Sequence, residues 1–291
     1  MSRDLPAFRA GGVSVEAFGF RLTRVKNRRY NRWLRLFRNA HALLAGNGDL
    51  HGLVRCPPLA NRLDGTARRV CEAGCGSGQF HLETLLRCKF QGMVVGLDVD
   101  FQALRCAQQT AEETGAAPQV RYVCGSAERL PFQEGVFDQI FLVDVLEHVH
   151  EDSAALKEGC RTLREGGRLE ISTPTPRYLR VFGGRIHRAV GHIRPGYSRP
   201  VLVERLKAAG FEVIYASQNT GYLLWPWMAL WYRLGWALWS PGKKRALAKG
   251  FCHGALMLSA LMTRIFRPLD LFGGYCSNDI QAEKKNPCRT P

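Results

Sequence analysis

The sequence lacks the patterns of several common protein classes. It has no Cys-x-x-Cys pair and its ten cysteines are scattered, so neither a zinc site nor a disulfide framework is predicted. It has no Gly-x-x-x-x-Gly-Lys-Ser/Thr loop, which argues against binding of a nucleoside triphosphate with magnesium. No long apolar run follows Arg3 and Asp4, so no signal peptide is expected. We therefore expect a cytoplasmic protein with reduced thiols.

Acidic side chains are scarce outside the middle of the chain. The 291 residues carry a formal net charge of +16, yet residues 63–172 hold 11 Lys and Arg against 17 Asp and Glu. The positive excess lies in residues 1–38, 177–207 and 241–267. Because a basic surface attracts polyanions, this distribution favours either nucleic acid or the anionic face of a membrane as a partner.

A glycine-rich segment follows the first apolar run of the acidic middle part. Residues 72–78 read Glu-Ala-Gly-Cys-Gly-Ser-Gly, and Asp98 ends the next apolar run. Glycines at a strand end let the backbone approach a nucleoside, and a carboxylate at the next strand end can accept both ribose hydroxyl protons. A dinucleotide fingerprint would need glycine at position 79, which is Gln79, so NAD and FAD are disfavoured.

The Glu-x-Gly-x-Gly-x-Gly segment resembles the first motif of the class I S-adenosylmethionine (SAM) dependent methyltransferases. The resemblance extends from about Arg68 to Thr173. Within the family, the sequence resembles the ubiquinone and menaquinone type of small-molecule and lipid methyltransferase. Its landmarks are, in order, residues 72–78, 94–98, 125–132, 137–149 and 163–169. Five landmarks in the expected order are much harder to meet by chance than a single loop.

The resemblance implies SAM as the cofactor and assigns the residues that hold it. The ribose position falls on Asp98. Ser126 stands where the family usually has an acidic residue that accepts the adenine amino proton, so contact of this side chain with adenine stays open. The implied cofactor-binding residues are Glu72, Gly74, Cys75, Gly76, Gly78, Asp98, Val99, Ser126, Ala127, Val143 and Asp144.

The wider pattern predicts an α/β fold with a parallel sheet, because short apolar runs alternate with segments of helical length. The runs lie near 69–72, 93–98, 120–124, 136–143 and 168–172. Residues 101–114 have helical spacing and end before Gly115, a stop signal. With two later strands near 211–217 and 277–282, the family likeness implies a Rossmann-like, doubly wound, mostly parallel seven-stranded sheet.

We divide the chain into four parts. Residues 1–62 are a basic helical N-terminal extension, and residues 63–221 are the SAM-binding core, in which 177–199 forms a substrate-side lid. Residues 222–272 are an apolar helical hairpin inserted before the last strand and tail, 273–291.

The inserted hairpin is rich in tryptophan. Five of the six tryptophans lie between residues 225 and 239, and a basic turn at 243–249 separates them from a second apolar stretch, 255–266. Pro226 and Arg233 interrupt the first arm, which argues against a membrane span. Tryptophans beside lysines favour a position in the membrane interface. The same pattern fits a soluble apolar lid over the active site.

The N-terminal extension has its own pattern. Between residues 28 and 44, aromatic and apolar residues recur at three- and four-residue steps with arginines between them, which predicts a basic amphipathic helix. Such a helix can cap the cofactor, lie on a membrane, bind RNA or simply pack on its own domain.

Candidate catalytic residues lie in two segments. Glu147-His148 follows the fourth strand, where the family places residues near the transferred methyl; some members bind a divalent metal with a similar grouping, but we predict no metal here. His192, Arg194 and Tyr197 resemble a His-x-Arg-x-Tyr-Ser segment of small-molecule and lipid-head methyltransferases. His192 can take a proton from a hydroxyl, and Arg194 can hold a carboxylate or phosphate. The catalytic candidates are His148, His192 and Tyr197, although His192 and Tyr197 would also suit a cap of the next helix.

These patterns predict a SAM-dependent methyltransferase that acts on a small apolar or lipid-linked acceptor at an anionic membrane surface, on the cytoplasmic side. The alternative is an RNA methyltransferase, or a non-catalytic subunit of the same fold, that uses the basic arms to bind RNA or partner proteins. Residues 143–146 lack the Asn/Asp-Pro-Pro-aromatic motif that methylation of a nucleobase amine usually needs, which disfavours this alternative. The acceptor atom and the oligomeric state do not follow from the sequence.

Overall fold

The computed structural model describes the central part of the chain. The described residues are 58–78, 80–82, 89–221, 223–230, 258, 261–262, 265–266 and 275–285, with the backbone alone at 185, 186 and 189. The predicted helix at 28–44 and most of the hairpin 222–272 lie outside these residues.

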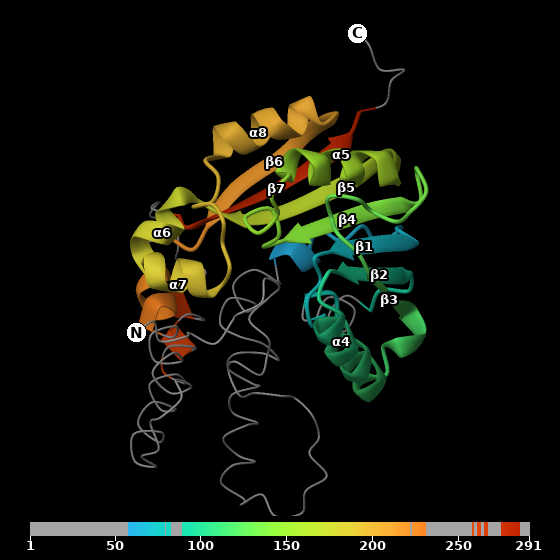
Figure 1. Cartoon of the computed structure of the whole chain (residues 1–291), viewed down its shortest axis with the longest axis horizontal. Coiled ribbons are helices and arrows are strands. Elements are labelled where there is room, and N and C mark those ends of the chain that lie inside the picture. Colours follow the sequence, from blue (N-terminus) through green and yellow to red (C-terminus); the bar gives the residue numbers. More distant parts are fainter. Residues whose placement is uncertain are drawn as a thin grey trace, which may run out of the picture.

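Seven strands form one sheet in the order β3-β2-β1-β4-β5-β7-β6 (Figure 1). The strands are β1 (Arg69–Ala73), β2 (Met93–Asp98), β3 (Val120–Cys124), β4 (Phe137–Val143), β5 (Leu163–Pro174), β6 (Phe211–Asn219) and β7 (Ser277–Lys284). β1 to β5 pair in parallel, whereas β7 runs antiparallel to both β5 and β6. The predicted doubly wound, mostly parallel sheet of seven strands is confirmed.

One strand is much longer than its apolar run. The run 168–172 lies inside β5, which has twelve residues. Leu163 pairs with Phe137, and after a register shift Arg168 pairs with Gln139. Gly166 lies between these pairs at φ 67°, a left-handed conformation. Residues 163–167, at the start of β5, read Leu-Arg-Glu-Gly-Gly and show no apolar alternation. The sequence pattern therefore missed the start of this strand.

Helices cover both faces of the sheet (Figure 1). They are α4 (Phe101–Thr114), α5 (Asp152–Thr162), α6 (Pro176–Phe182), α7 (Gly184–Ala189) and α8 (Arg199–Ala208), with a short 3₁₀ turn, η2 (Ala117–Gln119). The predicted helix α4 is confirmed: Asp100 caps its start by accepting from the backbone N–H groups of Gln102 and Ala103. Gly115 ends it at φ 79°.

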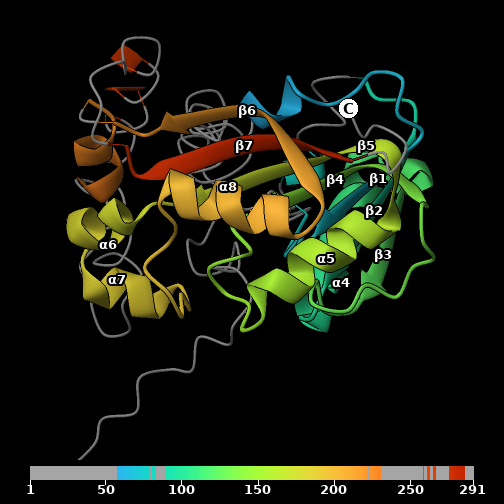
Figure 2. The same ribbon diagram turned by 90° about the horizontal axis from the view of Figure 1, so that it is seen from above.

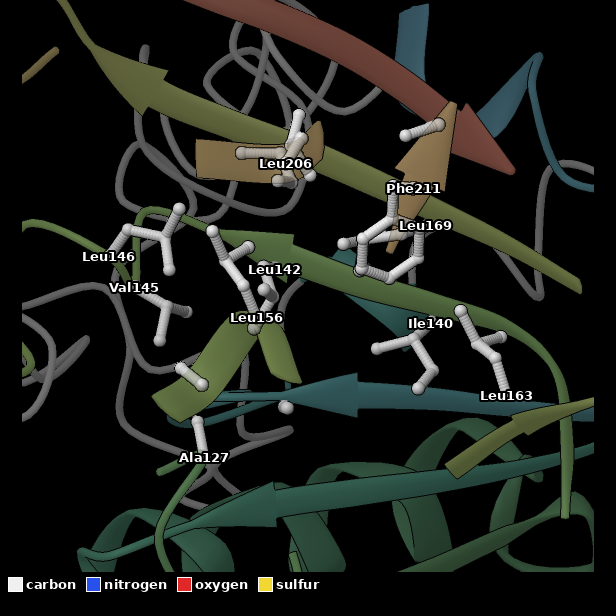
Figure 3. Packing of buried hydrophobic residues seen from close by; sticks show 14 of the residues in the cluster. Ala127, Ile140, Leu142, Val145, Leu146, Leu156, Leu163, Leu169, Leu206 and Phe211 are labelled. Carbon is white, nitrogen blue, oxygen red and sulfur yellow. The ribbon is translucent and has the colours of Figure 1, made fainter. Parts of the chain in front are cut away.

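Apolar packing joins the helices to the sheet in two layers. Leu156 of α5 and Leu206 of α8 are fully buried in one cluster with Leu169 of β5 (Figure 3). On the other face, Ala111 of α4 packs in a second cluster with Val94 of β2. Figure 2 shows α8 lying along β6 and β7. The loops at the carboxyl edge of the sheet are therefore supported by apolar packing on both faces.

The predicted lid and the roots of the hairpin lie at that edge. In both views, α6 and α7 lie beside the helical residues 225–230, near the end of β5 (Figures 1 and 2). The rings of Trp227 and Phe266 are stacked, with centroids 6.1 Å apart and an interplanar angle of 12°. The two arms of the predicted hairpin thus meet near their roots.

A buried polar network crosses the sheet face opposite to α5 and α8. Glu170 of β5 is fully buried and accepts hydrogen bonds from the amides of Gln139 (3.0 Å) and Gln281 (2.5 Å). The guanidinium of Arg62 lies 3.7 Å from Glu170 and stacks over the ring of Tyr215 at 4.5 Å. Residues just before β1 are thereby fastened to β4, β5, β6 and β7.

Candidate functional site

The glycine loop turns away from β1 at the carboxyl edge of the sheet. Gly74, Gly76 and Gly78 have φ angles of 83°, 51° and 80°, which glycine adopts without the penalty of a Cβ. A Cβ on Gly74 would lie 2.4 Å from Cγ2 of Val145, whereas nothing lies within 4 Å of a Cβ built on Gly76. Gly74 is therefore needed for packing, and the backbone at Gly76 faces open space.

Asp98 stands beside this open stretch, at the end of β2. Its carboxylate accepts hydrogen bonds from the backbone N–H of Gly76 (2.7 Å) and of Asp100 (2.8 Å). Each carboxylate oxygen can accept more than one hydrogen bond, so capacity for ribose hydroxyls is left. Val99, the next residue, is exposed. An open glycine backbone next to a carboxylate fits an adenosyl group.

Glu72 faces into the protein instead of the open stretch. It is 3% exposed, and its carboxylate accepts from the backbone N–H of His81 (3.2 Å) and contacts the ring Nδ1 of the same residue. Nε2 of His81 lies 2.8 Å from the hydroxyl of Tyr122. This buried chain holds the residues after the loop against β1 and β3. No motif in the sequence marked His81 or Tyr122.

The remaining predicted cofactor residues line the same edge. Ser126 is occupied in its own turn: its hydroxyl donates to Glu128 (3.3 Å) and accepts from the backbone N–H of Glu128 (3.1 Å). Ala127 is buried, and Asp144 follows β4 in a left-handed conformation at φ 54°. Contact of Ser126 or Asp144 with the cofactor stays a prediction. Burial raises the pKa of the Cys75 thiol, which disfavours the reactive thiolate form.

The loop after β4 meets the segment after α7 over the ends of β4 and β5. The backbone N–H of Ile193 donates to the carbonyl of Glu147 (3.0 Å), and Nδ1 of His148 lies 3.1 Å from the carbonyl oxygen of Gly191. The rings of His148 and His192 are in edge contact, with centroids 4.8 Å apart. Two histidines predicted separately are therefore neighbours. The prediction of no metal here stays a prediction.

Two side chains near His192 had no signal in the sequence. The rings of Tyr178 on α6 and His187 on α7 lie 5.2 Å and 5.1 Å from that of His192, between centroids. We call His148, His187, His192 and Tyr178 the histidine cluster. It brings together the loop after β4 and both short helices of the predicted lid.

Arg194 and Tyr197 have a different environment from the one predicted. Arg194 contacts the buried carboxylate of Asp152 and donates to the carbonyls of Val149 (2.8 Å) and His150 (2.9 Å). The prediction that Arg194 holds a substrate anion is therefore wrong, because the protein supplies its acceptors. A buried carboxylate at the start of α5 requires such a partner.

Tyr197 belongs to the same network. Its hydroxyl donates to Asp152 (2.5 Å), and it lies 3.1 Å from the carbonyl oxygen of Leu146. Burial and the Asp152 carboxylate raise the pKa of Tyr197, which makes it a poor general base near neutral pH. The side chain is 4% exposed and fastens the lid to the loop after β4.

The region around the glycine loop is similar to known methyltransferases. Residues 71–171 match a family model described as a methyltransferase domain. A ubiquinone biosynthesis O-methyltransferase from Xanthomonas euvesicatoria pv. vesicatoria is 29% identical over 190 residues, which cover 61% of this chain and 76% of that protein. A demethylmenaquinone methyltransferase from Lactococcus lactis subsp. lactis is 30% identical over 136 residues, 45% of this chain and 54% of that protein. The chain thus spans about half the length of this second relative.

Solved structures share the fold. A geranyl diphosphate methyltransferase in complex with SAM has a TM-score of 0.59 at 19% identity and covers 95% of this chain and 97% of its own. A [4+2]-cyclase has a TM-score of 0.56 at 21% identity, with coverage of 81% and 80%. The sequence relatives, the fold and the glycine loop together support the predicted class I SAM-dependent methyltransferase, with SAM as its cofactor.

Proposed function

We propose that this methyltransferase acts on a small, apolar or lipid-linked acceptor, of the quinone-precursor type, at the cytoplasmic surface of a membrane. The observation that carries the proposal is the histidine cluster at the ends of β4 and β5, next to the strand that leads to the glycine loop. The printed names of the relatives, which refer to ubiquinone and menaquinone biosynthesis, support the acceptor class.

Different residues of the site bind the cofactor, position the acceptor and take up the proton. When bound, SAM supplies an electrophilic methyl group on a sulfonium. Asp98 and the backbone at Gly76 hold and orient the adenosyl part, and the loop after β4 shapes the acceptor side. Close alignment of donor and acceptor without water is worth about 7–11 kcal/mol. For a hydroxyl acceptor, His192 or His148 takes the proton; Tyr197 is not retained in this role.

The membrane part of the proposal is supported by the described residues of the hairpin. These include exposed apolar side chains on helical residues, namely Leu230, Leu258, Leu261 and Ile265. The basic side chains of Arg180 and Arg188, on α6 and α7, are also exposed at this end of the sheet. Apolar side chains beside cations suit an anionic lipid surface. No described helix has the length and hydropathy needed to cross a bilayer.

The test uses SAM with a labelled methyl group. The protein is incubated with membrane lipids, a small-molecule extract and RNA in separate reactions, and each fraction is purified and counted. We expect the label in the lipid or the apolar small-molecule fraction. Label in RNA would overturn the acceptor class in favour of an RNA methyltransferase. SAM binding without label in any fraction would favour a non-catalytic subunit.

A further inference from the structure

Glu147 is a fully buried carboxylate in the loop after β4. Its Oε2 accepts a hydrogen bond from the hydroxyl of Thr173 on β5, at 3.0 Å. Its Oε1 lies 3.9 Å from Nε2 of His192, whose side chain is 7% exposed. Burying a carboxylate is costly unless a proton donor or cation accompanies it. Thr173 satisfies one oxygen, and the other lies 3.9 Å from the imidazole of His192, an ion-pair contact that is longer than a hydrogen bond.

The imidazole of His192 is held in place by its neighbours. Among the described residues, the titratable groups facing it are Glu147 and His148 from the loop after β4, Tyr178 from α6 and His187 from α7. The ring of His148 is itself fixed by its contact with the carbonyl oxygen of Gly191. Of these groups, Glu147 is the carboxylic acid.

We propose that Glu147 is a positioning residue that acts through His192, by holding a carboxylate 3.9 Å from Nε2 of its imidazole. The inference rests on the proposed function, in which His192 serves a hydroxyl acceptor. The O–H bond of the acceptor breaks and its proton moves to the imidazole of His192. The oxygen forms the bond to the methyl carbon, and the electron pair of the former carbon–sulfur bond stays on sulfur. The carboxylate of Glu147 stabilises the imidazolium that results.

The experiment compares Glu147→Gln with the unchanged protein and with Glu170→Gln. Glu170 is the matched control, because it is an equally buried glutamate, on β5, that hydrogen-bonds to Gln139 and Gln281 instead. The titration of His192 is followed by NMR of the imidazole carbon-bound protons, with a chelator present, and its signal is assigned with His192→Asn. We expect His192 to titrate at lower pH in Glu147→Gln and to be unmoved in Glu170→Gln.

The pH profile of kcat/KM is the second readout, measured with the acceptor fraction that takes up label. We expect Glu147→Gln to lower kcat about tenfold or more and to move the acidic limb to lower pH, because its imidazolium is less stable. An unmoved His192 titration in a folded Glu147→Gln protein would overturn the positioning role. If no fraction takes up label, the proposed function fails, while the NMR titration still decides whether Glu147 and His192 are coupled.

Discussion

At the residue scale, two acidic residues that the family resemblance assigns to the cofactor have different surroundings. Asp98 lies beside the open backbone at Gly76, whereas Glu72 is turned inward and bound to His81. The resemblance places both next to the cofactor, and of the two it is Asp98 that contacts the backbone of the open stretch. Asp98 is therefore expected to bind the ribose, and Glu72 to keep the loop in shape.

Asp98→Ala is expected to weaken SAM binding by about 1–3 kcal/mol, because a charged acceptor of hydrogen bonds is lost. Isothermal titration calorimetry measures the change. Asp98→Asn, which keeps one oxygen acceptor, should have an intermediate affinity, and Glu112→Ala, an exposed acid on α4, should bind as before. An Asp98→Ala protein with unaltered affinity would show that the ribose is held elsewhere.

The glycines at 74 and 76 allow a matched comparison of packing and ligand binding. Both need a positive φ, which costs an alanine about 1–2 kcal/mol. Gly74→Ala adds a clash with Val145, so its loss of unfolding free energy is expected to reach about 3 kcal/mol or more. Gly76→Ala should lose less stability but bind SAM more weakly, since its methyl enters the open space.

Urea unfolding without ligand and calorimetry with SAM separate the two effects. Equal losses of stability in both variants would contradict the assignment of Gly74 to packing. Unchanged SAM affinity in Gly76→Ala would show that the cofactor does not approach this part of the loop.

At the element scale, the chain before β1 is fastened to the sheet through polar groups. Gln139 of β4 donates to the carbonyl of Arg62 (2.9 Å) and accepts from the backbone N–H of Asp64 (2.9 Å). Glu170 lies under this contact, and burial raises its pKa to about 7. The contact between residues 62–64 and the sheet therefore depends on the protonation state of Glu170.

The raised pKa of Glu170 makes the protein less stable as the pH rises. In the unfolded chain this carboxyl group has the ordinary glutamate pKa of about 4.5, so the folded state binds the proton more tightly. This contribution is complete below about pH 4.5 and is lost as the pH passes about 7. Between about pH 5.5 and pH 8 we expect a loss of about 2 kcal/mol from this group. Urea unfolding at both values measures it.

Glu170→Gln tests whether this pH dependence of stability comes from Glu170. The amide cannot ionise, so the difference in unfolding free energy between the two pH values should shrink by most of this amount relative to the unchanged protein. A variant that keeps the full difference would place the proton on another group.

At the scale of the whole molecule, exposed basic side chains of the lid and exposed apolar side chains of the hairpin occur among the described residues. The chain has a formal net charge of +16, while residues 63–172 are net acidic. The lid helices α6 and α7, which carry the exposed Arg180 and Arg188, lie beside the helical residues 225–230 near the end of β5 (Figure 1). A membrane bound at this end would deliver a lipid-linked acceptor directly to the lid.

Replacing Leu258, Leu261 and Ile265 by glutamine is expected to abolish or strongly weaken association with anionic vesicles, because three apolar side chains no longer enter the interface. The measurement is co-sedimentation with vesicles that contain phosphatidylglycerol. A control with Val201→Gln and Ile214→Gln changes exposed apolar side chains on α8 and β6 and should bind as before. Added salt should weaken binding. Retained association of the triple variant would favour a soluble lid.

The fold was largely predictable, because its signals are local. The strand starting at Arg69, the glycine loop and the helix ending before Gly115 each follow from a few neighbouring residues. The roles of Arg194 and Tyr197 were not predictable, because both side chains bind a residue at the start of α5. Their partner Asp152 is more than forty residues away along the chain, and nothing near Arg194 shows that its charge is already neutralised.

The sequence by itself determined the class of fold, the cofactor loop and the carboxylate of Asp98, since backbone conformation and strand ends are specified by short patterns. Only the tertiary structure decided that Glu147, His148 and His187 all meet His192, that Glu72 turns to His81, and that Arg194 is occupied. The physical reason is that side-chain contacts between distant segments depend on the order and register of strands and on the path of the lid, which no local pattern contains.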